Sequence, residues 1–202
     1  NLDVNTFFEM TGMIGSICNN PEDYASFYHN YRGKRYRHDQ VHNLFGYYMT
    51  RSASEAFERY VPEKRILLFS RASYIGMHRF GGIWQGDNAS WWSHLKMNVK
   101  MMPSLNMCGF LYTGADVGGF GADATEDLVL RWLEFAVFTP LLRNHSARGT
   151  RRQEVYRFSH VEKFADVIGV RYQILPYIYS EYMKAALRNT MMFNPLSFLY
   201  GE

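Results

Sequence analysis

The loop at residues 81–88, GGIWQGDN, carries the residues best suited to acid–base chemistry. Its glycines allow tight backbone turns, Trp84 offers an apolar wall, and Asp87 directly follows a glycine. An apolar wall and a second carboxylate nearby both favour the protonated form of a carboxyl group. A general acid needs that form in order to protonate a leaving oxygen. The residues alone leave a second interpretation open, in which Asp87 caps a helix that begins near Ser90.

Three further polar side chains each stand at the end of a short apolar run, and they are Arg71, Asp116 and His145. Ligands bind at the carboxyl ends of the strands in barrels and in open parallel sheets. If the three runs are neighbouring parallel strands, these side chains point into one crevice. Alternatives stay open: a turn or cap for Asp116, a loop histidine bonded to backbone for His145, and a carboxylate partner for Arg71.

The pattern of apolar residues predicts helices and strands in alternation. Helices are expected at 41–60, 90–102, 125–138 and 161–188, the second ending before Pro103 and the last kinked at Pro176. Within 41–60, Ala53, Ala56 and Phe57 recur at helical spacing. Strands are expected at 65–70, 108–113 and 191–199, with another ending at 141–142. Such alternation implies an α/β fold with a parallel sheet and right-handed crossovers.

Size and composition exclude several classes of protein. The chain has 202 residues, enough for one core but fewer than the roughly 250 of a complete (β/α)₈ barrel. No stretch approaches the ~20 apolar residues of a membrane span. The basic residues behind the net charge of +3 are scattered and accompany no nucleic-acid-binding module. We therefore expect neither a membrane nor a nucleic acid as a partner.

The histidines and cysteines do not indicate a cofactor. His29, His38 and His42 match no standard zinc spacing, and the glycine-rich loop at 114–121 lacks the lysine of a phosphate loop. We expect no metal and no cofactor. The chain has 2 cysteines, which provide no disulfide framework and favour a cytoplasmic location.

Five motifs follow one another along residues 38–180. They are SRAS at 70–73, WQGDN at 84–88 with two further tryptophans at 91–92, TGADVGGF at 113–120, RW at 131–132 and RNH at 143–145. In type and order they resemble the T/S-R-S, W-x-G-D-N, G-A-D-x-x-G-F, R-W and R-N-H motifs of glycoside hydrolase family 31, the α-glucosidase and α-xylosidase family. Five motifs in the family's order make the resemblance strong.

The resemblance implies a (β/α)₈ TIM barrel that releases terminal α-linked glucose with retention of configuration. It implies that residues 41–202 form the second half of this catalytic barrel, and that residues 1–40 are an insertion or connecting segment on it. The implied partner is a small carbohydrate substrate, and a homo-oligomeric state of the whole protein stays open.

The resemblance also assigns roles to single residues. Asp87 corresponds to the general acid/base. The other implied residues contact the sugar in the −1 subsite: Arg71 and His145 at its hydroxyl groups, Trp84 and Phe120 as pocket walls, and Asp116 as polar support.

Two departures from the family's pattern matter. The family's nucleophile lies in a W-x-D-M-N-E strand end, which is absent from this chain and is expected upstream of Asn1. Because retaining enzymes need two carboxyl groups about 5–5.5 Å apart, we expect the isolated chain to be inactive. In addition, Ile83 stands where many members have histidine, which leaves α-xylosidase or transglucosylase activity open. A non-catalytic carbohydrate-binding barrel is the alternative from another class.

Overall fold

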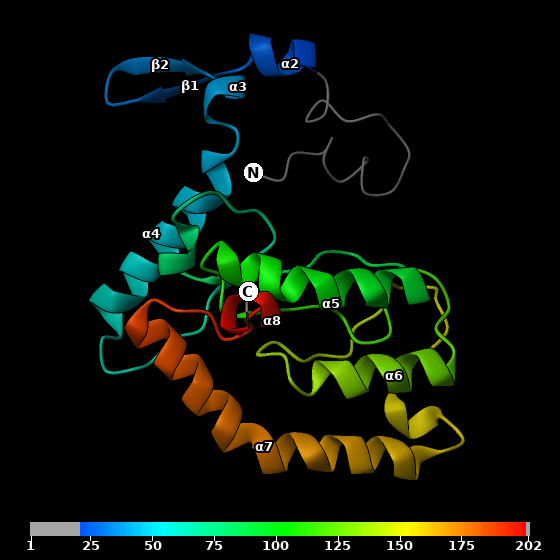
Figure 1. The fold of residues 1–202 in the computed structure, drawn as a ribbon. Helices are drawn as coiled ribbons and strands as arrows, with labels where there is room; N and C mark the ends of the chain where they lie inside the picture. Colours follow the sequence, from blue (N-terminus) through cyan, green and yellow to red (C-terminus); the bar gives the residue numbers. More distant parts are fainter. Residues whose placement is uncertain (1–20, 201–202) are drawn as a thin grey trace.

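The structure is a computed structural model that describes residues 21–200 (Figure 1), so predictions for residues 1–20 lie outside it. Its elements in chain order are α2 (Pro21–Ser26), β1 (Tyr28–Tyr31), β2 (Lys34–Arg37), α3 (His38–Val41), α4 (Leu44–Tyr60), β3 (Phe69–Ser70), η2 (Met77–Arg79), β4 (Gly82–Trp84), α5 (Trp92–Met107), β5 (Thr113–Gly114), α6 (Glu126–Ala136), η3 (Val155–Arg157), α7 (Val161–Arg188) and α8 (Leu196–Leu199).

The three strands β3, β4 and β5 form a parallel sheet in chain order, as the alternating pattern predicts. A fourth segment continues this order, because Asp116 and Arg143 form a parallel bridge. The strands are shorter than the apolar runs: of 65–70 only Phe69–Ser70 is strand. Phe69 is 41% exposed because β3 is the edge of the described sheet and has no further strand beside it.

Two glycines allow the neighbouring strands to approach closely. A Cβ atom on Gly82 would lie 2.2 Å from the carbonyl oxygen of Tyr112, and one on Gly114 would lie 2.0 Å from that of Leu141. No side chain fits at these distances. The sheet that carries the polar strand ends therefore depends on glycine at both positions.

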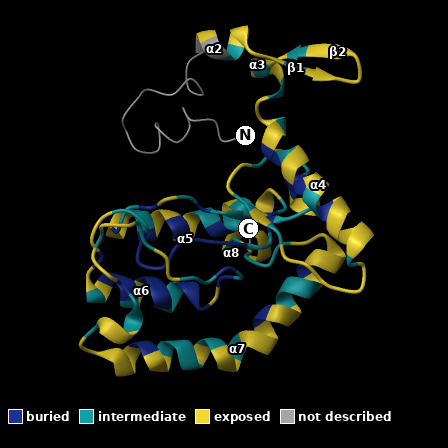
Figure 2. Ribbon diagram, turned by 180° about the vertical axis from the view of Figure 1, so that it is seen from behind, coloured by how far each residue is buried: buried dark blue, intermediate teal, exposed yellow. Residues whose placement is uncertain are grey.

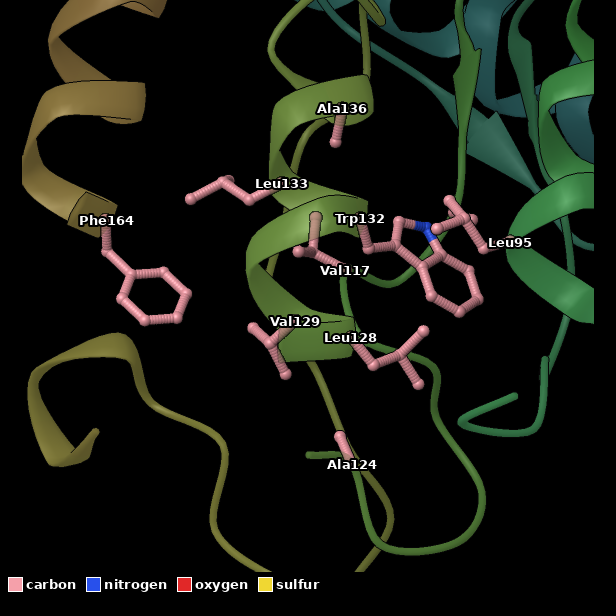
Figure 3. Close-up of a cluster of buried hydrophobic side chains, with 10 residues drawn as sticks. Leu95, Val117, Ala124, Leu128, Val129, Trp132, Leu133, Ala136 and Phe164 are labelled. Atoms are coloured by element: carbon pink, nitrogen blue, oxygen red, sulfur yellow. The ribbon is translucent and has the colours of Figure 1, made fainter. Parts of the chain in front are cut away.

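The core lies between α5, α6 and α7 and the loop after β5. The residues of α6 that face it recur at helical spacing: Leu128, Val129, Trp132, Leu133 and Ala136. Figure 3 shows the Trp132 ring beside Leu95 of α5, with Phe164 of α7 on the other side of α6. Thr125 caps α6: its hydroxyl oxygen accepts a hydrogen bond of 3.2 Å from the backbone N–H of Leu128.

The predicted end of α5 is wrong, whereas the helix predicted at 41–60 is confirmed as α4. Pro103 does not end α5 but lies inside it, because Met102 and Asn106 on either side are buried and their packing outweighs the missing backbone hydrogen bond. In α4 the buried residues are Gly46, Thr50 and Ser54. Of the apolar residues at helical spacing, Ala53 is half-buried, and Ala56 and Phe57 are exposed. Small side chains allow α4 to lie close to the chain after β3.

The C-terminal region contains one confirmed and one wrong prediction. α7 spans the predicted residues, and Figure 1 shows it bending along its length, with Pro176 inside it. The predicted strand at 191–199 is wrong, because the region ends in the short helix α8. The Asn106 side-chain oxygen accepts hydrogen bonds from the backbone N–H groups of Met192 and Phe193, so those donors are not free for a strand ladder.

The N-terminal part of the described chain holds a β-hairpin that the sequence analysis did not predict. β1 and β2 pair antiparallel across a turn in which Arg32 and Gly33 both have positive φ, the backbone of a type I′ turn. Figure 2 shows this hairpin and α4 largely exposed, whereas α6 is largely buried. No helix within residues 21–200 has the length and hydropathy to cross a membrane.

The close approach of the strands yields a stability prediction. Gly114→Ala should lower the free energy of unfolding by about 1–3 kcal/mol, because the new methyl group overlaps the Leu141 carbonyl oxygen. Gly169→Ala is the control: a Cβ there, in the interior of α7, meets nothing within 4 Å, so the change should raise stability by about 0.5–1 kcal/mol. Urea unfolding measures both, and a Gly114→Ala variant as stable as the parent would contradict the argument.

Candidate active site

The indole ring of Trp84 is the common contact of two arginine side chains. Trp84 is the last residue of β4, and the Cζ atoms of Arg71 and Arg143 lie over its ring, 4.8 Å and 5.3 Å from the centroid. Both distances are within the range of cation–π attraction. Arg71 follows β3, and Arg143 lies on the segment beside β5. Side chains from three of the four strand ends therefore meet at one ring.

Each of these arginines also binds a carboxylate. An Nη2–H of Arg71 donates to Oδ2 of Asp87 at 2.5 Å, and the Nε–H of Arg143 donates to Oδ1 of Asp116 at 2.6 Å. The Asp87 side chain is 39% exposed, whereas that of Asp116 is completely buried. The site thus contains two carboxylates in different surroundings, one facing solvent and one enclosed.

Burial raises the pKa of Asp116. The hydrogen bond and positive charge of Arg143 and the charge of His145 act in the opposite direction, while the negative charge of Asp87 adds to the rise. The second oxygen of Asp116, Oδ2, is buried and has no hydrogen-bond partner among the described residues. Asp116 begins a turn, since its carbonyl oxygen accepts from the backbone N–H of Gly119 at 3.0 Å, but its buried side chain is one half of an ion pair and caps no helix.

The alternative role of Asp87 as a helix cap is not observed. α5 begins after Trp91, and its N-terminus has no side-chain cap. Asp87 bonds to Arg71 instead, so the prediction that Arg71 pairs with a carboxylate is confirmed.

Phe120 and His145 form a second wall of the site. Their ring centroids lie 5.3 Å apart at an interplanar angle of 32°, and the His145 side chain is exposed. The backbone N–H of Phe120 donates to the carbonyl oxygen of Asn88 at 2.7 Å, which joins this wall to the loop of Asp87. The backbone of His145 is held by Gln153, whose side-chain amide reaches its carbonyl oxygen at 3.4 Å.

Two residues that organise the site, Arg143 and Gln153, had no predicted role. Arg143 appears in the RNH motif. Its pairing with Asp116 could have been predicted, because both residues stand at the ends of adjacent parallel strands and such strands end together. Gln153 is 2% exposed and donates to the carbonyl oxygens of Val117 and Gly119, both at 3.0 Å. It lies in a polar loop without periodicity, and nothing in the sequence distinguishes it.

The histidines of the hairpin region contact one another and a tyrosine. His29 Nε2 and His38 Nδ1 are 2.8 Å apart, and His42 Nε2 lies 3.1 Å from the Tyr24 hydroxyl. Desolvation by burial lowers the pKa of His38, and the charges of His29 and His42 lower it further. Within the part of the chain that the structure describes, no group of three His, Cys, Asp or Glu side chains could hold a metal ion.

Comparison with known proteins identifies the family. Residues 8–181 match the model of the glycosyl hydrolases family 31 TIM-barrel domain. This chain belongs to glycoside hydrolase family 31. The resemblance carried by the five motifs is thereby confirmed, and the described parallel sheet with its helices is part of a (β/α)₈ barrel.

Named relatives include α-glucosidases. The chain is 35% identical over 178 residues to alpha-glucosidase 2 of Bacillus thermoamyloliquefaciens, and 33% identical over 162 residues to a probable glucan 1,3-alpha-glucosidase of Oryza sativa subsp. japonica. These matches cover 86% and 79% of this chain but only 22% and 18% of the relatives. The chain therefore spans about a fifth of the length of these relatives.

Solved structures show the same fold. The chain matches a crystal structure of the glucosidase II alpha subunit with a TM-score of 0.76 and 32% identity, over 82% of this chain and 18% of that one. It matches a family 31 dextranase of Flavobacterium johnsoniae, complexed with glucose, with a TM-score of 0.80 and 26% identity, over 90% of this chain and 23% of that one.

The buried ion pair yields a second prediction. Arg143→Met leaves the Asp116 carboxylate buried without its partner, which should lower the free energy of unfolding by about 3–5 kcal/mol at neutral pH. Arg131→Met is the control, because Arg131 pairs with Glu134 on the exposed surface of α6 and its loss should cost less than about 1 kcal/mol.

The pH dependence identifies the cause. The pKa of Asp116 is raised in the folded state, so that state holds the proton more tightly than the unfolded chain, and stability falls as pH rises through the interval between the two values. The deficit of Arg143→Met should therefore shrink in acid, where Asp116 is protonated. Urea unfolding across a pH series measures this loss of stability. A loss that does not change with pH would contradict the role of the buried Asp116 charge.

Proposed function

We propose that this chain is part of a retaining α-glycoside hydrolase of the α-glucosidase type, which releases terminal α-linked glucose from oligosaccharides. The observation that carries the proposal is the contrast between two carboxylates at one tryptophan. Asp87 is partly exposed and bonded to Arg71, so it can reach a substrate oxygen. Asp116 is enclosed and bonded to Arg143, so it cannot reach solvent. Asp87 is therefore the proton donor.

In this mechanism Asp87 protonates the glycosidic oxygen as the bond to the leaving sugar breaks. It then removes a proton from the water that releases the bound glucose. The nucleophile that forms the glycosyl-enzyme is supplied from outside this chain, because its motif is absent from residues 1–202.

The remaining side chains bind the sugar. Arg71 and His145 supply donors for its hydroxyl groups, and Trp84 and Phe120 supply ring surfaces on which an apolar sugar face packs. Asp116 gives polar support to this pocket indirectly, through its ion pair with Arg143. The names of the relatives support α-linked glucose as the substrate, since they are α-glucosidases and a structure of the dextranase contains glucose.

The acid role of Asp87 is tested in the whole protein that contains this chain. Asp87→Asn should lower turnover of oligosaccharides by about 10²–10⁴-fold, because their leaving groups need a proton. The decrease in kcat/KM should be much smaller for a dinitrophenyl α-glucoside, whose leaving group departs as an anion. Asp127→Asn, at an exposed aspartate of α6, is the matched control and should leave both rates unchanged. Wild-type hydrolysis of oligosaccharides by Asp87→Asn would refute the role.

The origin of the nucleophile is tested with the 202-residue chain by itself. It should release no p-nitrophenol from a p-nitrophenyl α-glucoside, because the double displacement cannot form its covalent intermediate. Release above the rate without protein, and lost in Asp87→Asn, would show that this chain contains a nucleophile.

A further inference from the structure

The loop that carries Asp87 has no regular structure of its own. Residues 85–88 follow β4 without helix or strand, and the Asp87 side chain points to Arg71 and to solvent. General acid catalysis needs the carboxyl group within hydrogen-bond reach of one particular oxygen. The direction of Asp87 therefore depends on what fixes its neighbours.

The neighbouring Asn88 holds this loop from behind. Its side-chain amide donates to the carbonyl oxygens of Gln85, at 3.3 Å, and Gly86, at 3.1 Å. Its backbone carbonyl oxygen accepts hydrogen bonds from the backbone N–H groups of Phe120 and Gly121. Asn88 is 3% exposed, so water does not compete for these bonds. Asn88 thus fixes the chain on both sides of Asp87: its carboxamide holds residues 85–86 before the acid, and its backbone carbonyl oxygen fixes the chain directly after it.

The orientation of that carboxamide is set by Asn98 on α5. Asn98 is completely buried, and its Nδ2 donates to Oδ1 of Asn88 at 3.0 Å and to the carbonyl oxygen of His94 at 2.7 Å. This donor pairs with Oδ1 of Asn88 on the side of α5, and Nδ2 of Asn88 then faces the loop carbonyls.

Stability alone does not explain an asparagine at this position. Oδ1 of Asn98 is buried without a hydrogen-bond partner, which is unfavourable, and asparagine is a poor helix former. A leucine would fill a similar volume with neither cost.

α5 makes a second contact with the same loop. One turn before Asn98, the Nδ1 atom of His94 accepts a hydrogen bond of 2.9 Å from the backbone N–H of Ala89. Residues four apart lie on one face of a helix, so His94 and Asn98 hold the two residues after Asp87 from a single rigid surface.

We propose that Asn98 is a positioning residue for the general acid: through the carboxamide of Asn88 it holds the loop so that Asp87 meets the glycosidic oxygen. This inference rests on the proposed function, in which Asp87 is that acid. Asn98 touches neither substrate nor Asp87, and its effect passes through Asn88.

The test compares two substrates with Asn98→Leu in the whole protein that contains this chain. For an oligosaccharide, kcat/KM should fall about tenfold or more, because a displaced acid no longer protonates the leaving oxygen. For a dinitrophenyl α-glucoside it should change less than about twofold, because this leaving group needs no proton. The constant kcat/KM is used because it reports only the steps up to formation of the glycosyl-enzyme.

The matched control is Asn106→Leu. Asn106 is a buried asparagine of the same helix, 3% exposed, but its amide bonds to the Phe110 carbonyl oxygen and to the backbone before α8, at the end of α5 away from the acid loop. This variant should lose stability without changing the ratio of the two kcat/KM values. Asn98→Ala, which also removes the donor, serves if the leucine variant does not fold.

An unchanged substrate ratio in a folded Asn98 variant would overturn the inference. Asp87→Asn, measured in the same assay, distinguishes failure of the positioning role from failure of the acid role. If Asp87→Asn shifts the ratio and the Asn98 variants do not, only the positioning role is wrong. If Asp87→Asn does not shift it either, the proposed acid itself is wrong.

Discussion

The ion pair between Asp116 and Arg143 joins the last two segments of the parallel sheet at the end where the chemistry takes place. Its carboxylate is buried, so the guanidinium group that balances the charge cannot move far without exposing an unpaired ion to an apolar interior. That same guanidinium group lies over Trp84, whose ring also contacts Arg71. The ion pair, one strand further along the sheet, thus helps to fix the position of Trp84. Through Arg71 it also helps to fix the position of Asp87.

This arrangement gives different roles to two aspartate side chains that are chemically identical in the sequence. Enclosure makes Asp116 a structural charge and an acceptor, whereas partial exposure leaves Asp87 in reach of a substrate. The loop of Asp87 gains its rigidity from three directions: Arg71 on its open side, the Phe120 loop beside it, and α5 behind it. Together with the hydrogen bonds that Asn88 makes within the loop, these contacts explain how a stretch without regular structure can hold an acid in place.

Sequence reasoning succeeded where the signal was local. The spacing of apolar residues in α6, its Thr125 cap and the length of α7 follow from rules that act within one or two turns. The parallel order of the strands follows from their alternation with helices. The hairpin, the helical end of the chain and the continuation of α5 through Pro103 depend on packing between distant segments. The Asn98–Asn88 bond joins residues 10 positions apart, but only the way α5 folds back over the loop makes them meet.

Gly82 and Gly114 give the sheet a property that concerns its redesign. Strand positions are commonly improved by introducing β-branched residues, because such residues prefer extended backbone. At these two positions the rule would select destabilising residues, because the close approach of the strands leaves no room for a side chain. A library that scores residues by strand preference would select substitutions that force the strands apart. A separation at Gly82 would reach Trp84 first, because both residues lie on β4.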